Sequence, residues 1–186
     1  MAGDLGARFY NRPAVSLSSL RVASITLGSS RTDLLCRARE DEIVFRFLDE
    51  GVAASARLLG EREAPETCRA VLDALPVAGL ARHGIYSGSE VYLVLPELLT
   101  PRRENATTIV RPGDVGFLTV EKGSGYGIEE DYSEVCWFYD HDATPSMPEG
   151  PIAVNVFARL YDADPFFGVC RRMRLEGAKR LEIARA

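Results

Sequence analysis

Beyond residue 41 the sequence divides into short runs in which apolar and polar residues alternate, with turns between them. Ile43, Phe45 and Phe47 occupy alternate positions of one run, and the segment 152–160 is apolar at every second position too. An alternation of period two predicts β-strands that turn one face toward a core. We expect strands over residues 42–48, 52–59, 80–86, 91–95, 115–120, 134–139, 152–160 and 181–183.

Two segments have the periodicity of amphipathic helices instead. In residues 65–75, apolar residues recur three, four and seven positions after Cys68, which places them on one face of a helix. The second segment covers residues 164–177. We expect Asp164 to cap this helix just before Pro165, and Gly177 to end it.

Strands in this number, joined by short turns, are typical of a sandwich or a barrel rather than a parallel sheet. Two lone helices fit the open ends of a barrel. We therefore expect a mainly β protein, a closed barrel of about eight strands with two helices at the barrel ends. Its length of 186 residues suits one domain, which we place at residues 40–186. Residues 1–39 keep no lasting period and are expected to form an N-terminal arm or extension.

The chain carries a formal net charge of −5, and its acidic groups concentrate in residues 41–150. An acidic body does not suit nucleic acid, because such binding depends on neutralising phosphates. No run approaches the ~20 apolar residues of a membrane helix, and arginines interrupt the N-terminal segment where a signal peptide needs an apolar stretch. We expect a cytoplasmic protein that binds neither nucleic acid nor membrane. Its basic arm could reach the acidic body of a second copy and form a homo-oligomer.

The cysteines and glycines lack the spacing of a metal or phosphate site. No Cys-x-x-Cys pair occurs among the four cysteines. Cys68, Cys136 and Cys170 lie among apolar neighbours and are expected to be reduced core residues. The glycine-rich run 123–127 lacks the Lys-Ser/Thr ending of a phosphate loop and indicates a flexible turn.

The two histidines do not suggest a metal site either, because zinc needs three or four ligands at workable spacing. Asp140 and Asp142 flank His141, and with Glu134 they could hold a hard metal, but nothing in the sequence fixes that geometry. We expect no metal and no cofactor.

Side chains that could recognise a small ligand occur in two places. Glu104, Asn105 and Thr107 could hydrogen-bond a ligand at a barrel mouth, or Asn105 and Thr107 could simply satisfy backbone groups of the loop. Tyr86 and Tyr139 lie at expected strand ends, where a phenol hydroxyl can stay in water. His83 shares an expected strand with Tyr86 and could be a base or a hydrogen-bonded structural residue.

Several short motifs follow one another in order: Glu66-Thr67-Cys68-Arg69-Ala70, Leu75-Pro76, His83 with Tyr86-Ser87-Gly88, Glu104-Asn105-Ala106-Thr107, Pro112-Gly113-Asp114, Tyr139, Asn155-Val156-Phe157-Ala158-Arg159 and Glu176-Gly177-Ala178-Lys179. Together they resemble domain-of-unknown-function family 3830, a bacterial and archaeal family of uncharacterised proteins with a cyclophilin-like fold. The resemblance covers residues 41–184 and implies a closed β-barrel with helices at its ends. It does not carry over prolyl isomerase activity, since the sequence lacks the Phe-x-x-x-Arg-x-x-x-Gly-Phe and Gln-Gly-Gly-Asp runs of cyclophilins.

Three functions remain open. The first is binding of a small molecule or short peptide at a polar and aromatic cleft. The second is an enzyme, either prolyl isomerase-like or an acid–base lyase or hydrolase that uses His83 and Glu104. The third is subunit assembly through the N-terminal arm. For the first, the expected ligand-binding residues are His83, Tyr86, Glu104, Asn105, Asp114 and Tyr139, although Asp114 could simply cap its turn.

Overall fold

The computed structural model describes residues 41–60 and 62–186. The expected N-terminal arm, its role in assembly and Cys36 lie outside these residues. In the described part of the chain, no helix is long and apolar enough to cross a membrane.

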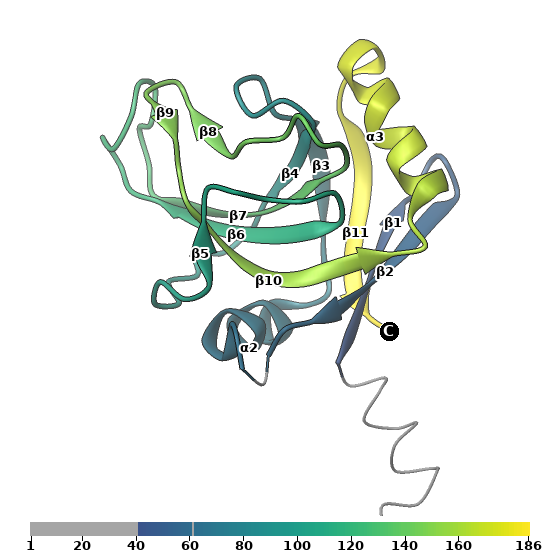
Figure 1. Ribbon diagram of the computed structural model, residues 1–186, viewed down its shortest axis with the longest axis horizontal. Coiled ribbons are helices and arrows are strands. Elements are labelled where there is room, and N and C mark those ends of the chain that lie inside the picture. Colours follow the sequence, from purple (N-terminus) through teal and green to yellow (C-terminus); the bar gives the residue numbers. More distant parts are fainter. Residues whose placement is uncertain (1–40, 61) are drawn as a thin grey trace, which may run out of the picture.

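Eight antiparallel strands close into a barrel (Figure 1). Around the barrel the order is β2-β1-β11-β3-β4-β7-β6-β10, and β10 pairs with β2 to close the ring. The strands are β1 (Glu42–Phe47), β2 (Val52–Leu58), β3 (Val77–His83), β4 (Glu90–Val94), β6 (Asp114–Val120), β7 (Tyr132–Phe138), β10 (Val154–Tyr161) and β11 (Lys179–Arg185). The expected mainly β barrel is thereby confirmed.

Three very short strands lie outside this ring. The two-residue β5 (Ala106–Thr107) extends the sheet beyond β10. A small separate hairpin pairs β8 (Ser146–Met147) with β9 (Gly150–Pro151), between the expected strands 134–139 and 152–160, where no strand was expected.

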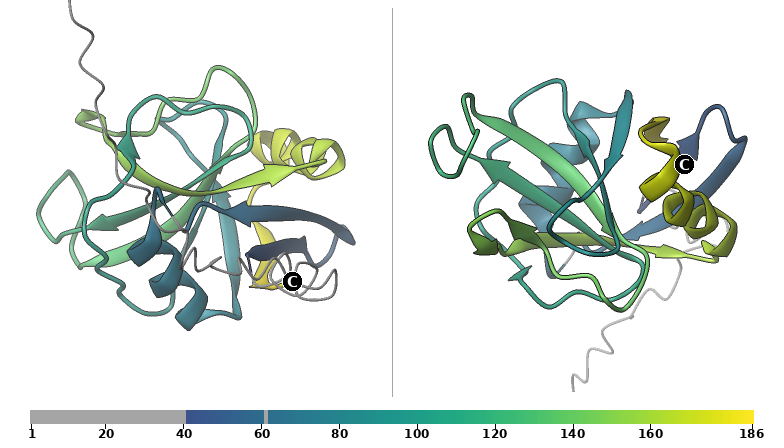
Figure 2. Two further views of the ribbon diagram at one scale, coloured as in Figure 1. Left: turned by 60° about the horizontal axis from the view of Figure 1, so that its bottom comes forward. Right: turned by 90° about the horizontal axis from the view of Figure 1, so that it is seen from above.

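The helices α2 (Pro65–Ala74) and α3 (Asp164–Glu176) lie on different sides of the barrel (Figures 1 and 2). Buried residues of both belong to the same apolar cluster as the barrel interior. Phe166 of α3 stacks on Phe47 with ring centroids 4.6 Å apart, and Trp137 meets Phe45 edge-on at 5.4 Å. The two amphipathic stripes thus cover the interior, as their spacing predicted.

Most boundaries differ from the expected ones by one to three residues, and three of the differences have a plain physical reason. β3 ends at His83 rather than Tyr86, because the chain bends over residues 85–89 after a last cross-strand bond from the Gly84 N–H to the Glu90 carbonyl at 2.9 Å. Ala163 rather than Asp164 occupies the cap of α3, so the Asp164 charge acts on the first helical turn instead. β11 is a full strand, because it pairs with β1 on one side and β3 on the other.

A second apolar cluster lies on the outer face of β6, β7 and β10. Its buried members include Leu118, Cys136, Phe138 and Val156. Side chains from residues 121–131 and from the β8–β9 region pack over it, among them Ile128, Met147 and Ile152. This part of the barrel wall is therefore covered rather than solvated, and charged groups on it are buried.

Candidate functional site

The structure places the six expected ligand-binding residues in four separate surroundings. Only His83 and Tyr139 are brought together by a hydrogen bond. Tyr86 lies in the turn that follows β3, Glu104 and Asn105 lie beside α2, and Asp114 begins β6.

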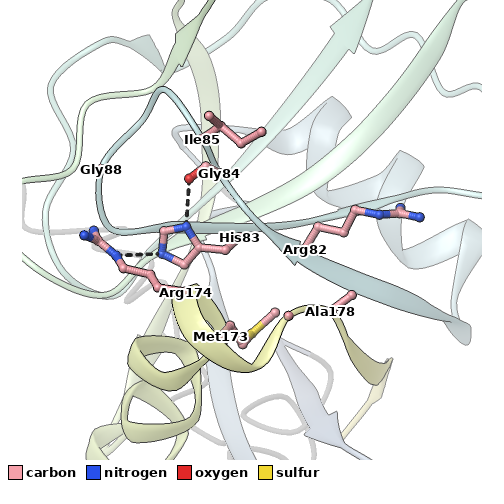
Figure 3. Close-up of a pocket in the computed structure, with 9 residues that line it drawn as sticks. Arg82, His83, Gly84, Ile85, Gly88, Met173, Arg174 and Ala178 are labelled. Atoms are coloured by element: carbon pink, nitrogen blue, oxygen red, sulfur yellow. Dashed lines mark hydrogen bonds between the residues drawn. The ribbon is translucent and has the colours of Figure 1, made fainter.

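His83 and Tyr139 form a hydrogen-bonded cluster with Arg174 of α3. Figure 3 shows the contact between His83 and Arg174. The Nδ1 of His83 lies 2.7 Å from the Gly84 carbonyl, so Nδ1 carries the proton. Its Nε2 then accepts from the Tyr139 hydroxyl at 2.6 Å and from the Arg174 Nε at 3.2 Å. Burial lowers the pKa of His83, the Gly84 carbonyl opposes this, and the Arg174 charge lowers it further. The imidazole is therefore neutral at neutral pH.

A cleft of about 500 Å³ opens beside this cluster, lined by Arg82, His83, Gly84, Ile85, Gly88, Met173, Arg174, Gly177 and Ala178. In Figure 3 the Arg82 side chain extends away from His83, and Arg174 reaches toward it. Arg174 is also within 3.5 Å of Asp142 and 3.2 Å of the Ser89 hydroxyl. The hydrogen-bond and ion-pair partners of the Arg174 guanidinium are thus mostly side chains of the protein itself.

Glu104 and Asn105 join helix α2 to strand β10. The Glu104 carboxylate accepts from the Thr67 backbone N–H at 2.6 Å, in the first turn of α2. The Asn105 side-chain amide donates to the Val156 carbonyl at 2.6 Å. Both groups therefore bond backbone groups of other elements, whereas Thr107 bonds the Ile109 backbone of its own loop, as the structural interpretation predicts. The other carboxylate oxygen of Glu104 is buried without a hydrogen-bond partner among the described residues. Among the hydrogen bonds of the described residues, none joins Glu104 to His83.

Asp114 holds a turn together. One carboxylate oxygen accepts from the Arg111 backbone N–H at 2.9 Å, and the other accepts from the Arg159 Nε at 2.9 Å. Its side chain is 6% exposed, so little of it remains for a ligand.

Tyr86 lines a different hollow, on the covered outer wall of the barrel. We call it the carboxylate pocket. Its volume is about 240 Å³. It lies between the β3–β4 turn, strands β4 and β7, residues 121–131 and β8. Its lining residues are Gly84, Ile85, Tyr86, Ser87, Glu90, Tyr92, Tyr126, Ile128, Tyr132, Glu134, Ser146, Met147 and Pro148.

The β3–β4 turn is fixed against the β7–β8 connection. The Ser87 hydroxyl donates to the Ser146 carbonyl at 3.1 Å and accepts from the Ser146 N–H at 2.9 Å. Gly88 has φ +71°, and a Cβ there would lie 2.5 Å from the Asp142 carbonyl oxygen. Only glycine permits this close approach, which holds one wall of the carboxylate pocket in place.

Two glutamates are buried in this pocket. Glu90 is 5% exposed and Glu134 is 7% exposed. On the paired strands, Glu90 lies opposite Phe138 and Glu134 opposite Val94, so the Tyr92–Cys136 pair lies between them. No hydrogen bond or ion pair of the described residues reaches the Glu134 carboxyl group, which faces the pocket.

The environment favours protonated carboxyl groups in this pocket. Burial raises the pKa of Glu134 to about 8, and the neighbouring Glu90 contributes to the rise. Burial also raises the pKa of Glu90, which hydrogen bonds from Ser87 and Cys136 partly offset. The pKa of Tyr132 is raised to about 12, by burial and then by Glu134. Acids with such values in a cleft are typical of functional sites.

Sequence reasoning named Glu134 only as a metal ligand and passed over Glu90. The sequence does indicate that Glu134 is buried, because it lies in a strand with apolar residues on both faces. Val135 and Trp137 lie on the inner face of the barrel, and Cys136 and Phe138 lie on the outer face. A carboxylate there must be buried. Within the described ranges, no group of three or more His, Cys, Asp or Glu residues is arranged to hold a metal ion.

The fold and the pocket define a small, closed antiparallel β-barrel protein with a covered hollow on its outer wall. A family described as "Protein of unknown function (DUF3830)" matches residues 47–185. The chain belongs to this family, the one its motifs resemble. The cyclophilin likeness and the prokaryotic origin stay predictions.

One solved structure with a similar fold is described as "Structure of McbB in complex with tryptophan". Its TM-score is 0.56 at 15% sequence identity. The match covers 77% of this chain but 44% of that one, so the chain spans less than half of the neighbour's length. No curated protein matches the chain.

Proposed function

We propose that the protein binds a small molecule in the carboxylate pocket. The observation that carries this proposal is the Glu134 carboxyl group, buried in the pocket without a hydrogen-bonding or ionic partner among the described residues. A buried polar group without a partner costs free energy, and native proteins keep few of them without a reason. A bound ligand that pairs with Glu134 would supply that reason.

The mouth of the pocket supports the same proposal. Ile85, Tyr86 and Tyr126 are 86%, 58% and 87% exposed, although they are large and apolar or aromatic. All three line the pocket. Exposed apolar groups gathered around a hollow are typical of binding sites. The structural neighbour is described in complex with tryptophan, which is consistent with a small ligand for a protein that contains a similar fold.

Of the expected ligand-binding residues, Tyr86 takes part directly in this proposal. We assign His83 and Tyr139 to positioning, because the cleft beside His83 shares Gly84 and Ile85 with the carboxylate pocket and Tyr139 bonds His83. Glu104, Asn105 and Asp114 are assigned to the structural contacts described above. A short peptide that inserts one side chain into the pocket remains within the proposal.

A thermal-shift screen against metabolites tests the proposal. The variant Tyr86→Ala removes a mostly exposed ring at the mouth, and Tyr161→Ala removes a ring on β10 outside the pocket. We expect a ligand to raise the melting temperature of the wild type and of Tyr161→Ala, and to raise that of Tyr86→Ala less. Equal shifts in all three proteins, or no shift with any compound, would contradict the proposal.

A second candidate function is acid–base catalysis in the same pocket. The raised pKa of Glu134, about 8, favours it, since a carboxylic acid that keeps its proton near neutral pH can donate it to a substrate. Glu90 would be the partner that accepts a proton. Mass spectrometry of bound compounds after incubation tests this, with conversion expected for the wild type and lost in Glu134→Gln.

Prolyl isomerase activity and subunit assembly gain less support from the structure. No arginine lines the carboxylate pocket, whereas a prolyl isomerase would need a positioned arginine in its apolar groove. The closed eight-stranded barrel with two helices supports the expected likeness to cyclophilins in fold. Subunit assembly would depend on an arm outside the described residues and stays a prediction.

A further inference from the structure

We propose that the ligand of the carboxylate pocket is an organic cation, a protonated amine attached to an apolar or aromatic body. This inference rests on the proposed function and names the chemical class of its ligand. Three features of the pocket carry it: the charges of the lining, the position of the aromatic rings and the apolar mouth.

The lining carries acidic groups and no basic ones. Glu90 and Glu134 are its carboxyl groups, and no lysine, arginine or histidine lines the pocket. None of the ion pairs of residues 41–60 and 62–186 includes Glu90 or Glu134. A buried carboxylate needs a partner of opposite charge to stay ionised. The protein does not provide one, so a ligand would have to.

The pair of glutamates suits a single positive charge. Two neighbouring carboxyl groups in a low dielectric do not both ionise readily, so the pair keeps one proton. A monocation that replaces this proton leaves the total charge of the pocket unchanged. An ammonium group placed over the Tyr92–Cys136 pair would have Glu90 on one side and Glu134 on the other.

Tyrosine rings supply the second part of the recognition. Tyr92 and Tyr132 are half-buried in the lining, and Tyr86 and Tyr126 lie exposed at the mouth. Aromatic faces attract organic ammonium groups, and more strongly where water is excluded. Apolar surface for the body that carries the amine comes from Ile85, Ile128 and Met147.

The same lining suits a divalent metal poorly. Ca²⁺ prefers six to eight oxygen ligands and Mg²⁺ a near-ideal octahedron. Here two glutamates and one serine pair share the space with four tyrosines and three aliphatic or thioether side chains. The arrangement therefore favours a large, weakly hydrated cation over a small, strongly hydrated one.

Protons should compete with such a ligand. Glu134 shares the pocket with Glu90 and Tyr92 from β4, with Tyr132 from its own strand and with Tyr126 from residues 121–131, and Cys136 follows it on the same face of its strand. Arg82, opposite Tyr92 on β3, is a cation whose charge acts on Tyr92. Because the pKa of Glu134 is raised to about 8, the carboxyl group is mostly protonated at pH 6.5 and mostly ionised at pH 9. Amine affinity should rise across this interval, provided that the amine itself stays protonated.

The test uses the full-length protein and matched probes. Each probe set holds an arylalkyl or alkyl amine, the alcohol of the same skeleton and the corresponding carboxylate. Binding is measured by calorimetry for the wild type, Glu134→Gln and Glu129→Gln, which alters an exposed carboxylate outside the pocket. Mg²⁺ and Ca²⁺ are titrated alone.

We expect amines to bind the wild type at least tenfold more tightly than their alcohols. The affinity should rise roughly 20-fold to 30-fold from pH 6.5 to pH 8.5, because one proton is displaced from a group of pKa about 8 on binding. Glu134→Gln should remove both the preference and the pH dependence, and Glu129→Gln should change neither. If Glu134→Gln fails to fold, Glu90→Gln serves in its place with the same expected losses.

The outcomes separate the two levels of the proposal. If alcohols or carboxylates bind as tightly as amines, and Tyr86→Ala weakens them, the pocket binds small molecules but the cationic class is wrong. Binding of a divalent metal that depends on Glu134, without binding of any amine, also overturns the cationic class proposed here. If no probe and no metabolite binds in the pocket, both the inference and the proposed function fail.

Discussion

At the scale of single residues, the buried polar groups of this protein fall into two kinds. Most have partners: Ser133, fully buried, accepts from the Leu99 N–H at 3.0 Å and donates to the Glu97 carbonyl at 3.2 Å. Glu134 follows it in the chain and has none among the described residues. Glu50 and Glu104 also have a buried carboxylate oxygen without a hydrogen-bond partner among the described residues, but neither lines the pocket. Glu134 differs from them because its side chain lines the pocket.

Removing the Glu134 carboxyl group should change how stability depends on pH. The folded-state pKa, about 8, lies above the ordinary value of 4.5, so the folded state binds more protons than the unfolded state between these values. Wild-type stability should therefore fall as pH rises through this window and level off above it. We expect Glu134→Gln to abolish roughly 2–4 kcal/mol of that fall. Urea unfolding at pH 5 and pH 9 measures it.

The pH dependence of stability must be compared between the wild type and the variants. The pKa of Glu90 is raised too, so Glu90 adds its own pH dependence to the stability of each of these proteins. Glu129→Gln, in an exposed position, should follow the wild type. A Glu134→Gln protein whose stability falls with pH as steeply as the wild type would show that Glu134 is ionised in the folded state.

The Tyr139 hydroxyl should contribute to stability through His83 and Arg174. Tyr139 is 2% exposed, so its expected contact with water is wrong, and the hydroxyl bonds to protein groups instead. We expect Tyr139→Phe to cost about 1–2 kcal/mol, because the His83 Nε2 loses a donor. A double-mutant cycle with His83→Ala should give a coupling energy of about 1 kcal/mol. Tyr161→Phe, on β10, is the control, and additive effects at Tyr139 and His83 would refute the coupling.

At the scale of elements, residues 102–107 act as a strap between α2 and β10. Asn155 of β10 holds it, since its amide donates to the Thr67 hydroxyl at 3.1 Å and to the Arg102 carbonyl at 3.0 Å, and its carbonyl oxygen accepts from the Glu104 N–H at 3.2 Å. The short β5 then pairs with β10. The motif containing Glu104 is therefore explained by the docking of a helix.

Loss of the Asn155 side chain should loosen helix α2 before the rest of the barrel. Asn155→Ala leaves buried groups of Thr67 and Glu104 without partners, at a cost of about 2–4 kcal/mol. Native-state hydrogen exchange should show α2 amides losing protection while those of β7 keep it. Thr108→Ala, at an exposed position in the same segment, should leave both unchanged. Equal loss in α2 and β7 would mean that the strap acts on the whole barrel.

The sequence predicts elements well where one side-chain pattern decides them. Ile43, Phe45 and Phe47 give β1 its face, and the stripe counted from Cys68 gives α2. The expected end of β3 is wrong because a bend of the backbone over residues 85–89, not a change in the side-chain pattern, stops the strand. The carboxylate pocket needs the pairing of β4 with β7, about 40 residues apart in the chain, which no local pattern encodes.

At the scale of the whole molecule, the fold depends on one closing pair of strands. β2 pairs with β1 on one edge and with β10 on the other, and without the second pairing the ring would be an open sheet. The apolar cluster inside spans strands of both halves and both helices. Opening the barrel would therefore expose one shared core, so we expect closure and folding to be a single cooperative event.

A proline on the closing edge of β2 should prevent this event. The Leu59 N–H donates to the Phe157 carbonyl at 2.7 Å, so the Arg57 N–H, two residues earlier, faces β10 as well. Arg57→Pro removes that donor and should cost about 3 kcal/mol or more. Arg57→Ala, which keeps the N–H, should cost much less.

The matched control is Ala53→Pro, on the same edge of the same strand. The pairing of β2 with β10 ends at Ser55 and Tyr161, so the N–H of Ala53 lies beyond it and a proline removes no bond to β10. Thermal unfolding followed by circular dichroism should rank the melting temperatures as wild type, Ala53→Pro, then Arg57→Pro by a wide margin. If both proline variants melt together, closure through β10 contributes little, and the barrel is held by its helices and the remaining strand pairs instead.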